Sequence, residues 1–346
     1  MSAQPLLSVR DLRVGFTTEA GRLQAVNGVS FELAAGEVLA IVGESGSGKS
    51  VTAQTILGLT RSPNATIEGS VSLRGAELLD AGEAELRKVR GAEIAMIFQD
   101  PMTSLNPVYR VGAQLVEAIR AHDASVSKDA GRKRAIELLD AVGIADAERR
   151  VDDYPHEFSG GMRQRAMIAM GLTLEPDVLI ADEPTTALDV TIQAQILRLL
   201  EDLNRERNLA TILITHDLGV VAEMADRVLV MYAGRVVEAG TLDEIFYDPQ
   251  HPYTWGLLGS LSRLDRPRPR RLPQISGAPP SLLAPPSGCA FRPRCPHEFG
   301  KCSSLPGLEA RIEDGPDHAD RCWLKPAKKR ELREVEGRIG LEAPAA

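Results

Sequence analysis

Short apolar runs alternate with helical segments over residues 7–232, and this alternation predicts a layered α/β domain. Residues 38–42 are apolar throughout, as expected of a strand that is buried on both faces, and a glycine-rich loop follows them. Residues 178–181 and 210–215 are two further candidates for buried strands, and polar residues follow each of them. Ligands of open α/β sheets bind at the carboxyl ends of the strands, so the pattern predicts a ligand site at this edge.

Other segments predict antiparallel strands beside this parallel core. Residues 7–16 and 24–33 read as two strands joined by a turn at Gly21. Residues 228–232 and 236–238 read as a hairpin that turns at Ala233 and Gly234. A helix is predicted from Lys49 onward, directly after the glycine-rich loop.

The strand pattern fades between about residues 101 and 173, where residues 111–121 and 133–142 show helical spacing of apolar positions. We interpret this stretch as a helical subdomain inserted into a domain that covers residues 1–260. Residues 263–271 are basic and interrupted by proline, and residues 273–286 contain too much proline for a helix or a central strand. We expect a linker over residues 261–287 and a small irregular module over residues 288–346. We interpret the basic part of the linker as a solvated tether, with a contact to lipid or to a partner as the alternative.

Composition narrows the classes of protein that fit. The net charge of −8 argues against a general attraction to nucleic acid, which requires a basic surface. No apolar run approaches the ~20 residues that a membrane-spanning helix requires, and residues 1–7 lack the features of a signal peptide. We therefore expect a cytoplasmic chain that reaches a membrane only through a partner.

Residues 43–50 read Gly-Glu-Ser-Gly-Ser-Gly-Lys-Ser, which fits the phosphate-loop pattern between a predicted strand and a predicted helix. The glycines let successive backbone N–H groups turn toward phosphates, while the helix dipole favours negative charge. In such loops the lysine reaches the β- and γ-phosphates and the serine binds Mg²⁺. The predicted nucleotide-binding residues are Gly43, Glu44, Ser45, Gly46, Ser47, Gly48, Lys49, Ser50 and Val51.

Two carboxylates follow the predicted strand at residues 178–181. In nucleotide triphosphatases the first such carboxylate holds the metal, and the second orients or deprotonates the attacking water. Asp182 and Glu183 are candidates for these two roles. An acidic pair alone is a weak indication, because acids often end strands, but together with the phosphate loop it predicts a triphosphatase, a class that still includes kinases and motor ATPases.

A second candidate anion site lies at Phe158-Ser-Gly-Gly-Met-Arg-Gln-Arg165. Ser159 is a favourable helix N-cap, and Gly160 and Gly161 leave bare amides at the start of a helix that runs from Met162 toward Leu172. The segment resembles the signature motif of the ABC ATPase family. In that family the motif closes over ATP held by the other ATPase subunit, so the resemblance implies a head-to-tail pair of cassettes.

Further markers of the family follow in the expected order over about residues 5–260. Gln99 matches the Q-loop, which contacts Mg²⁺ and the attacking water and faces the membrane subunits. Residues 187–189 match the D-loop, which places Asp189 across the dimer, and His216 matches the switch histidine at the γ-phosphate. Phe16 is a candidate for stacking on adenine, with packing into the core as the equal alternative.

The signature carries Phe158 and Met162 where the wider family most often has Leu and Gln. In this the chain resembles the importers of oligopeptides, dipeptides and nickel, as it also does at residues 99–107, at residues 251–254 and in its cysteine-containing tail. The resemblance implies a RecA-like mixed sheet with an antiparallel β subdomain and a helical insert. It also implies an ATP hydrolase at the cytoplasmic face of the inner membrane. The partners that it leads us to expect are a second, paralogous ATPase subunit, two permease subunits and an extracytoplasmic binding protein.

Three other functions are alternatives to a peptide importer. Subunits of the same type also serve importers of nickel or other small solutes, and the sequence of this chain does not indicate which solute is transported. A non-transport ABC protein of DNA repair has a long coiled coil between the halves of its site, and one of translation has two cassettes; this chain has a compact insert and one cassette. A purely regulatory module fits poorly with the intact acid pair and His216.

All four cysteines lie in the tail, at Cys289, Cys295, Cys302 and Cys322. Their spacing fits neither a zinc ribbon nor the plant-type iron–sulfur pattern, so unligated thiols, zinc and a cluster all remain open on spacing alone. His297 and His318 are alternative ligands. Some peptide-importer ATPases carry a four-iron cluster in this tail, and on that resemblance we expect a structural [4Fe–4S] cluster.

Overall fold

The computed structural model describes residues 4–100, 104–186, 188–260, 274–310 and 318–335. Its contacts divide the chain into two compact units, each made of several chain segments. The first unit consists of Met1–Leu6, Leu33–Val38 and Ala76–Ile214. The second unit consists of Leu7–Glu32, Leu39–Gly75 and Thr215–Ala346.

Parallel strands form the centre of the first unit. Strand β6 (Ile94–Ile97) pairs with β7 (Val178–Asp182), and β7 pairs with β8 (Ala210–Thr215). Every residue of β7 and β8 is buried, which is why both appear in the sequence as continuous apolar runs. The prediction of these two strands is confirmed, whereas β6 is a strand that the pattern did not predict.

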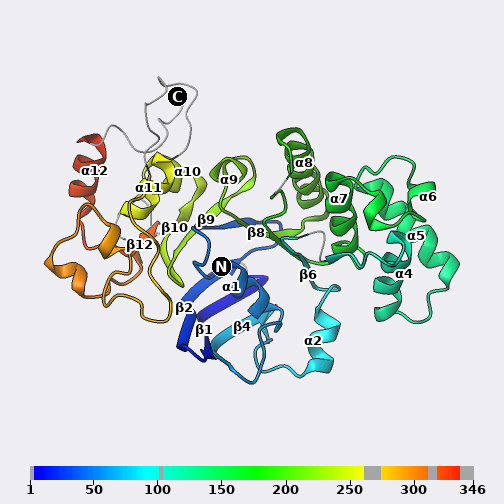
Figure 1. Ribbon diagram of the computed structural model, residues 1–346, viewed down its shortest axis with the longest axis horizontal. Coiled ribbons are helices and arrows are strands. Elements are labelled where there is room, and N and C mark those ends of the chain that lie inside the picture. Colours follow the sequence, from blue (N-terminus) through cyan, green and yellow to red (C-terminus); the bar gives the residue numbers. More distant parts are fainter. Residues whose placement is uncertain (1–3, 101–103, 187, 261–273, 311–317, 336–346) are drawn as a thin grey trace. The chain divides into compact units, whose positions relative to one another are not determined.

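Helices fill the described part of residues 104–173, which contains no strand. They are α4 (Val111–His122), α5 (Lys128–Ala141), α6 (Ala147–Arg150), a 3₁₀ helix (Pro155–Glu157) and α7 (Gly160–Gly171). Helices α4, α5 and α7 pack on one another, as their shared green region in Figure 1 shows. The unit also contains β5 (Ala76–Glu77), α2 (Glu83–Val89) and α8 (Val190–Arg207). The helical character predicted for this stretch is confirmed.

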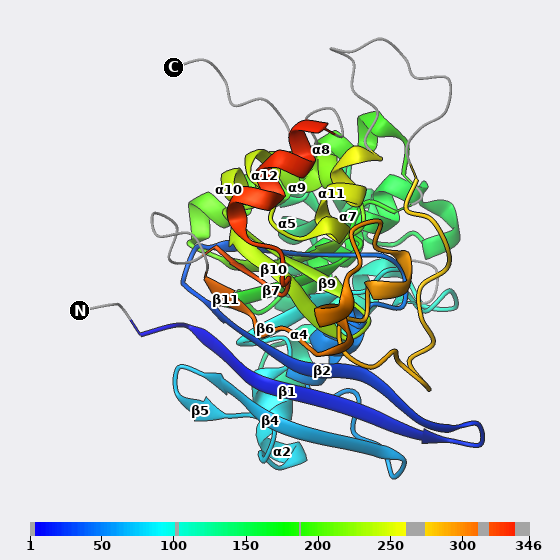
Figure 2. The same ribbon diagram turned by 90° about the vertical axis from the view of Figure 1, so that its left-hand side faces the viewer.

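Three long strands lie side by side in the second unit, in the order β2, β1, β4 (Figure 2). They are β1 (Leu7–Thr18), β2 (Gly21–Leu33) and β4 (Ala65–Leu73), and β1 runs antiparallel to β4. A bulge between Arg10 and Arg13 keeps the apolar residues on both sides of it pointing inward. The strands predicted at residues 7–16 and 24–33 are confirmed.

The same unit contains mixed strand pairing. Strand β3 (Val38–Val42) is parallel to β9 (Arg227–Tyr232), and β9 is antiparallel to β10 (Arg235–Thr241). The short strands β12 (Ala319–Asp320) and β11 (Glu309–Ala310) extend it antiparallel. Helices α1 (Lys49–Ile56), α9 (Leu218–Met224), α10 (Leu242–Tyr247) and α11 (Pro252–Gly259) complete this part. The predicted hairpin at Ala233 and Gly234 and the helix from Lys49 are confirmed.

The cysteine-containing tail packs on the core of the second unit. Phe291 lies against Tyr232 and Tyr253, with ring centroids 5.3 Å and 5.4 Å away. Residues 274–286 contain neither helix nor strand, as their proline content predicts. Two 3₁₀ helices (Arg292–Arg294 and Gly300–Ser303) follow, and α12 (Pro326–Val335) is a helix that the expected irregular module did not include. The predicted domain boundaries stay predictions, and the basic stretch at 263–271 lies outside the described residues.

A buried carboxylate joins the tail to β10. Glu238 is fully buried and accepts hydrogen bonds from the backbone N–H groups of Gln250 and His251, from the Thr254 hydroxyl and from His318 Nε2 at 2.8 Å. Burial acts to raise the pKa of Glu238, but these donors outweigh it and hold the pKa below its usual value. Burial opposes the charge on His318 as well, yet the Glu238 carboxylate raises its pKa. The two side chains form a hydrogen-bonded pair inside the protein.

No helix in these described ranges is both long enough and apolar enough to cross a lipid bilayer.

Candidate nucleotide-binding site

The loop at residues 43–48 leads from β3 into α1 in the second unit, and two of its glycines are required by close contacts. A Cβ atom on Gly43 would lie 2.2 Å from the Met231 carbonyl oxygen, and one on Gly48 would lie 2.4 Å from the Ala25 carbonyl oxygen. Both residues also have positive φ, at 151° and 100°. Only glycine fits at these positions, so the backbone geometry of the loop is set by its sequence.

Lys49 is buried and its side chain folds over the loop. The Lys49 ammonium donates to the carbonyl oxygens of Gly43 at 2.7 Å and Glu44 at 3.1 Å. Within the described part of the chain, the buried hydroxyl of Ser47 has no hydrogen-bond partner. Ser45 and Gly46 are exposed, and Ser50 and Val51 are half-buried in the first turn of α1. A glycine-shaped loop with a buried, unpaired hydroxyl fits an anion that accepts hydrogen bonds.

The acid pair lies at the end of β7 in the first unit. Asp182 is buried, and Glu183 is half-buried with a left-handed φ of 50°. Glu183 Oε2 accepts hydrogen bonds from Gln99 Nε2 at 2.9 Å and from Thr186 Oγ1 at 2.8 Å. The structure thus joins two predicted site residues, Gln99 and Glu183, and adds Thr186, which sequence analysis missed.

The signature segment begins helix α7 as predicted, although the helix starts at Gly160 and not at Met162. The Ser159 hydroxyl accepts from the Met162 N–H at 3.3 Å, which is the N-cap that the sequence predicts. A Cβ on Gly161 would lie 2.7 Å from Ile192 Cγ2, so α7 and α8 approach closely there. A Cβ on Gly160 would meet nothing closer than Leu188, at 3.8 Å.

The remaining predicted site residues are placed as follows. Asp189 caps α8 by accepting from the Ile192 N–H at 3.0 Å, while Ala187 of the same motif lies outside the described residues. His216 is exposed directly after β8. Phe16 is half-buried on β1 opposite Ala65, which leaves both of its expected roles open.

The four cysteines line one small cavity in the second unit, together with His297. The loops that carry two of them touch, because the Cys289 N–H donates to the Cys302 carbonyl oxygen at 3.0 Å. Burial raises the pKa of the Cys295 thiol to about 12 and that of the Cys322 thiol to about 11. It also raises the pKa of the Cys289 thiol. None of the four forms a disulfide.

The expected metal site is not confirmed. Among the described residues no group of three or more His, Cys, Asp or Glu side chains lies close enough together to hold a metal ion. His318 is engaged with Glu238 and does not line the cysteine cavity. The structure therefore gathers the cysteines at one place, and no metal centre is visible there among the described side chains.

Comparison with known proteins finds family matches in two parts of the chain. The family profile "ABC transporter" matches residues 26–186, and the profile "Oligopeptide/dipeptide transporter, C-terminal region" matches residues 237–302. The dipeptide transport ATP-binding protein DppD of Bacillus subtilis is 54% identical over 93% of this chain and 95% of its own length. The oligopeptide transport ATP-binding protein OppD of Escherichia coli is 55% identical over 89% of this chain and 90% of its own length.

A solved structure agrees with these matches. The cassette MJ0796, in a dimeric post-hydrolysis state bound to ADP and Pi, has a TM-score of 0.61 and 28% identity over 68% of this chain and 98% of its own. The chain is thus an ABC-type ATPase with an α/β fold. Within that class, it belongs to the family of oligopeptide and dipeptide ABC transporter ATP-binding proteins.

Proposed function

We propose that this chain drives the uptake of oligopeptides or dipeptides by hydrolysing ATP. The observation that carries the proposal is the likeness to peptide-transport ATP-binding proteins over nearly the whole chain, including the tail. A nickel or other small-solute importer is the alternative cargo. A non-transport ABC ATPase is less favoured, since the tail matches a region described for peptide transporters.

The loop at residues 43–51 binds the phosphates of ATP in this proposal. Lys49 contacts the β- and γ-phosphates, and the Ser47 hydroxyl is a free donor or acceptor for the same ligand. Mg²⁺ is held by Ser50, Asp182 and Gln99, and it neutralises phosphate charge when bound. Phe16 stacks on the adenine ring.

Glu183 acts as the general base toward the attacking water. Its carboxylate accepts from Gln99 and Thr186, and these two donors fix its orientation. His216 counters charge on the γ-phosphate together with Lys49. The nucleotide held by a second ATPase subunit is contacted by Ser159, Gly160, Gly161 and Asp189. ATP binding therefore favours a closed pair of subunits, and hydrolysis releases the pair.

The partners follow from this role. A paralogous ATPase subunit completes the pair, and two permease subunits dock near Gln99 and helices α4–α7. An extracytoplasmic binding protein supplies the peptide. The chain then works at the cytoplasmic face of the inner membrane, attached through the permeases.

The cargo can be tested with the assembled complex in proteoliposomes. We expect ATP-dependent uptake of a labelled dipeptide or oligopeptide, because the binding protein and permeases select the solute while this chain supplies the energy. Nickel offered in place of the peptide is the control and should not accumulate. ATP-dependent accumulation of nickel without peptide uptake contradicts the proposed cargo.

We also propose that the tail holds a structural [4Fe–4S] cluster, with Zn²⁺ as the alternative. Support comes from four unpaired cysteines around one cavity and from their buried, neutral-favouring surroundings, which a bound cation offsets. A multinuclear cluster holds its cysteines farther apart than a single ion does, so it fits such a loose group better than zinc does. Cys289, Cys295, Cys302 and Cys322 are the proposed ligands.

Metal content distinguishes these alternatives. Full-length protein purified without oxygen is expected to be brown, with an iron-to-sulfide ratio of about one, as in a [4Fe–4S] cluster. Cys302→Ser should lose the iron, while the adjacent Ser303→Ala, which removes only a hydroxyl bonded to the Gly300 carbonyl oxygen on an exposed residue, should retain it. Colourless, zinc-loaded protein would show that the cluster assignment is wrong.

A further inference from the structure

A side chain of the tail, Arg294, contacts the phosphate loop. Its guanidinium forms two hydrogen bonds to the Glu44 carboxylate, from Nη1 to Oε2 at 2.6 Å and from Nη2 to Oε1 at 3.0 Å. The two residues are 250 positions apart in the sequence. The Arg294 side chain is 5% exposed and that of Glu44 is 28% exposed, so the pair is shielded from most of the screening that weakens surface ion pairs.

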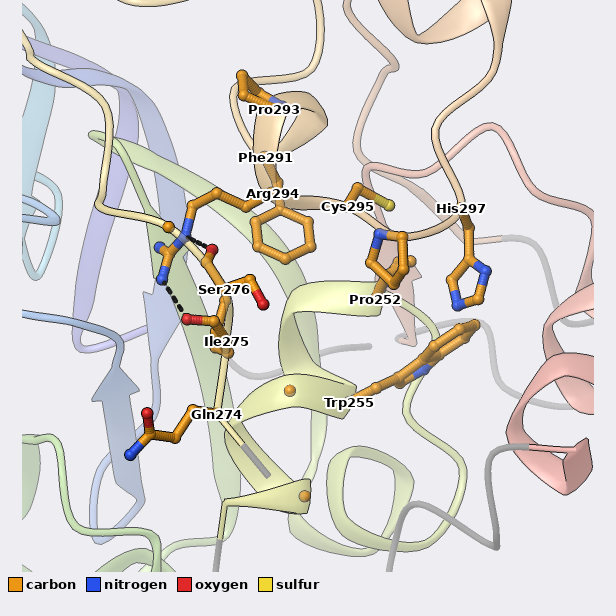
Figure 3. A pocket seen from close by; sticks show the side chains of 14 residues that line it. Pro252, Trp255, Gln274, Ile275, Ser276, Phe291, Pro293, Arg294, Cys295 and His297 are labelled. Carbon is orange, nitrogen blue, oxygen red and sulfur yellow. Dashed lines mark hydrogen bonds between the residues drawn. The ribbon is translucent and has the colours of Figure 1, made fainter. Parts of the chain in front are cut away.

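Every N–H of the Arg294 guanidinium has an acceptor. Besides Glu44, it donates from Nε to the Ser276 carbonyl oxygen at 2.9 Å, from Nη1 to the Tyr232 hydroxyl at 3.3 Å and from Nη2 to the Ile275 carbonyl oxygen at 3.4 Å. Figure 3 shows the side chain reaching toward Ser276 and Ile275. Five donors with five acceptors hold the planar group in one orientation. The hydrogen bonds that Arg294 donates to the Glu44 carboxylate raise the pKa of Arg294, which therefore stays charged.

Glu44 is fixed at its backbone as well as at its side chain. Its N–H donates to the hydroxyl of the buried Tyr253 at 2.8 Å. The start of the phosphate loop is thus bound to α11 and to the tail, independently of any contact that Lys49 makes.

The contact between Arg294 and Glu44 affects phosphate binding because Glu44 carries a negative charge. Glu44 is the one carboxylate among residues 43–51, and the ligand proposed for these residues is a triphosphate. Like charges repel, and the repulsion is strong where water is partly excluded. We propose that Arg294 is a positioning residue that neutralises Glu44 and fixes the start of the loop, so that the loop accepts ATP. This inference rests on the proposed role of residues 43–51 in nucleotide binding.

Four variants of the full chain test the inference by calorimetric titration with Mg·ATP, and by kcat and KM in the assembled complex. Arg294→Met removes the charge at similar length and is expected to weaken ATP binding about tenfold and to raise KM, with kcat little changed. Arg294→Lys keeps the charge but loses the paired geometry, so it should fall between Met and wild type. Adding Glu44→Gln to Arg294→Met removes the carboxylate charge that Arg294 no longer neutralises and should restore binding to within about threefold of wild type.

Arg292→Met is the matched control, because Arg292 has the same charge on the same turn but pairs with Glu298 at 3.4 Å. It should bind ATP as wild type does. Unchanged ATP affinity in Arg294→Met overturns the inference, and so does a double variant as weak as Arg294→Met. If both Lys49→Met and Arg294→Met bind ATP normally, the proposed nucleotide-binding role of the loop is wrong. If Arg294→Met binds ATP normally and Lys49→Met does not, the loop binds the nucleotide but Arg294 does not position it.

Discussion

We expect the Glu183→Gln variant to hydrolyse ATP about a hundred to ten thousand times more slowly than wild type while it still binds ATP. The carboxylate is already oriented by Gln99 and Thr186, and the amide keeps its size and shape but cannot take a proton. The ATP-bound closed pair should therefore accumulate. Single-turnover hydrolysis and gel filtration with Mg·ATP measure the two effects.

Glu175→Gln is the matched control for this experiment. Glu175 belongs to the same unit and, like Glu183, has a left-handed φ, of 55°. Its carboxylate forms an exposed ion pair with Arg134, and the residue precedes β7, whereas Glu183 follows the other end of that strand. Turnover in Glu175→Gln should match wild type. Near-normal turnover in Glu183→Gln would exclude Glu183 as the base.

The Lys49→Met variant is expected to lose both ATP affinity and turnover, with kcat about a hundredfold or more below wild type. Lys49 is 6% exposed, and its ammonium lies on the loop carbonyls of Gly43 and Glu44, where no other side chain of residues 43–51 carries a positive charge. Methionine preserves most of the buried stem and removes the ammonium, with its charge and its hydrogen bonds to the two carbonyl oxygens. Equilibrium binding of Mg·ATP and steady-state hydrolysis are the measurements.

Lys133→Met serves as its control, because Lys133 is an exposed lysine on α5. The same exchange there should leave binding and turnover unchanged. A Lys49→Met protein that folds and hydrolyses ATP at the wild-type rate contradicts the assignment of residues 43–51 as the nucleotide loop.

Strands buried on both faces are the part of this fold that sequence predicts best. Strands β3 and β8 match their predicted bounds, and β7 extends one residue further, because each is a continuous apolar run beside a polar edge. The N-cap at Ser159 was predictable for a local reason too, since the serine and the helix it caps are neighbours in the chain. Strand β6 is only four residues long, too short to distinguish from a buried helical turn.

Contacts between distant residues are the part that sequence does not predict. Arg294 is adjacent to Cys295 in the sequence, and nothing in that position indicates its contact with Glu44. Thr186 lies only three residues after Glu183, so distance does not explain why it was missed. A threonine near an acid pair has many structural roles, and its residue type alone does not indicate this contact. Helix α12 was missed because the composition of the tail before it, rich in proline, glycine and cysteine, predicts irregular structure.

The buried Glu238 carboxylate sets an order of events during synthesis. Its partner His318 is 80 residues further along the chain, so it leaves the ribosome about 4 to 16 seconds later. Until then, the nascent polypeptide has a negative charge that cannot be enclosed with its full set of donors. The last strands of this unit can therefore close with all their contacts only after His318 has left the ribosome.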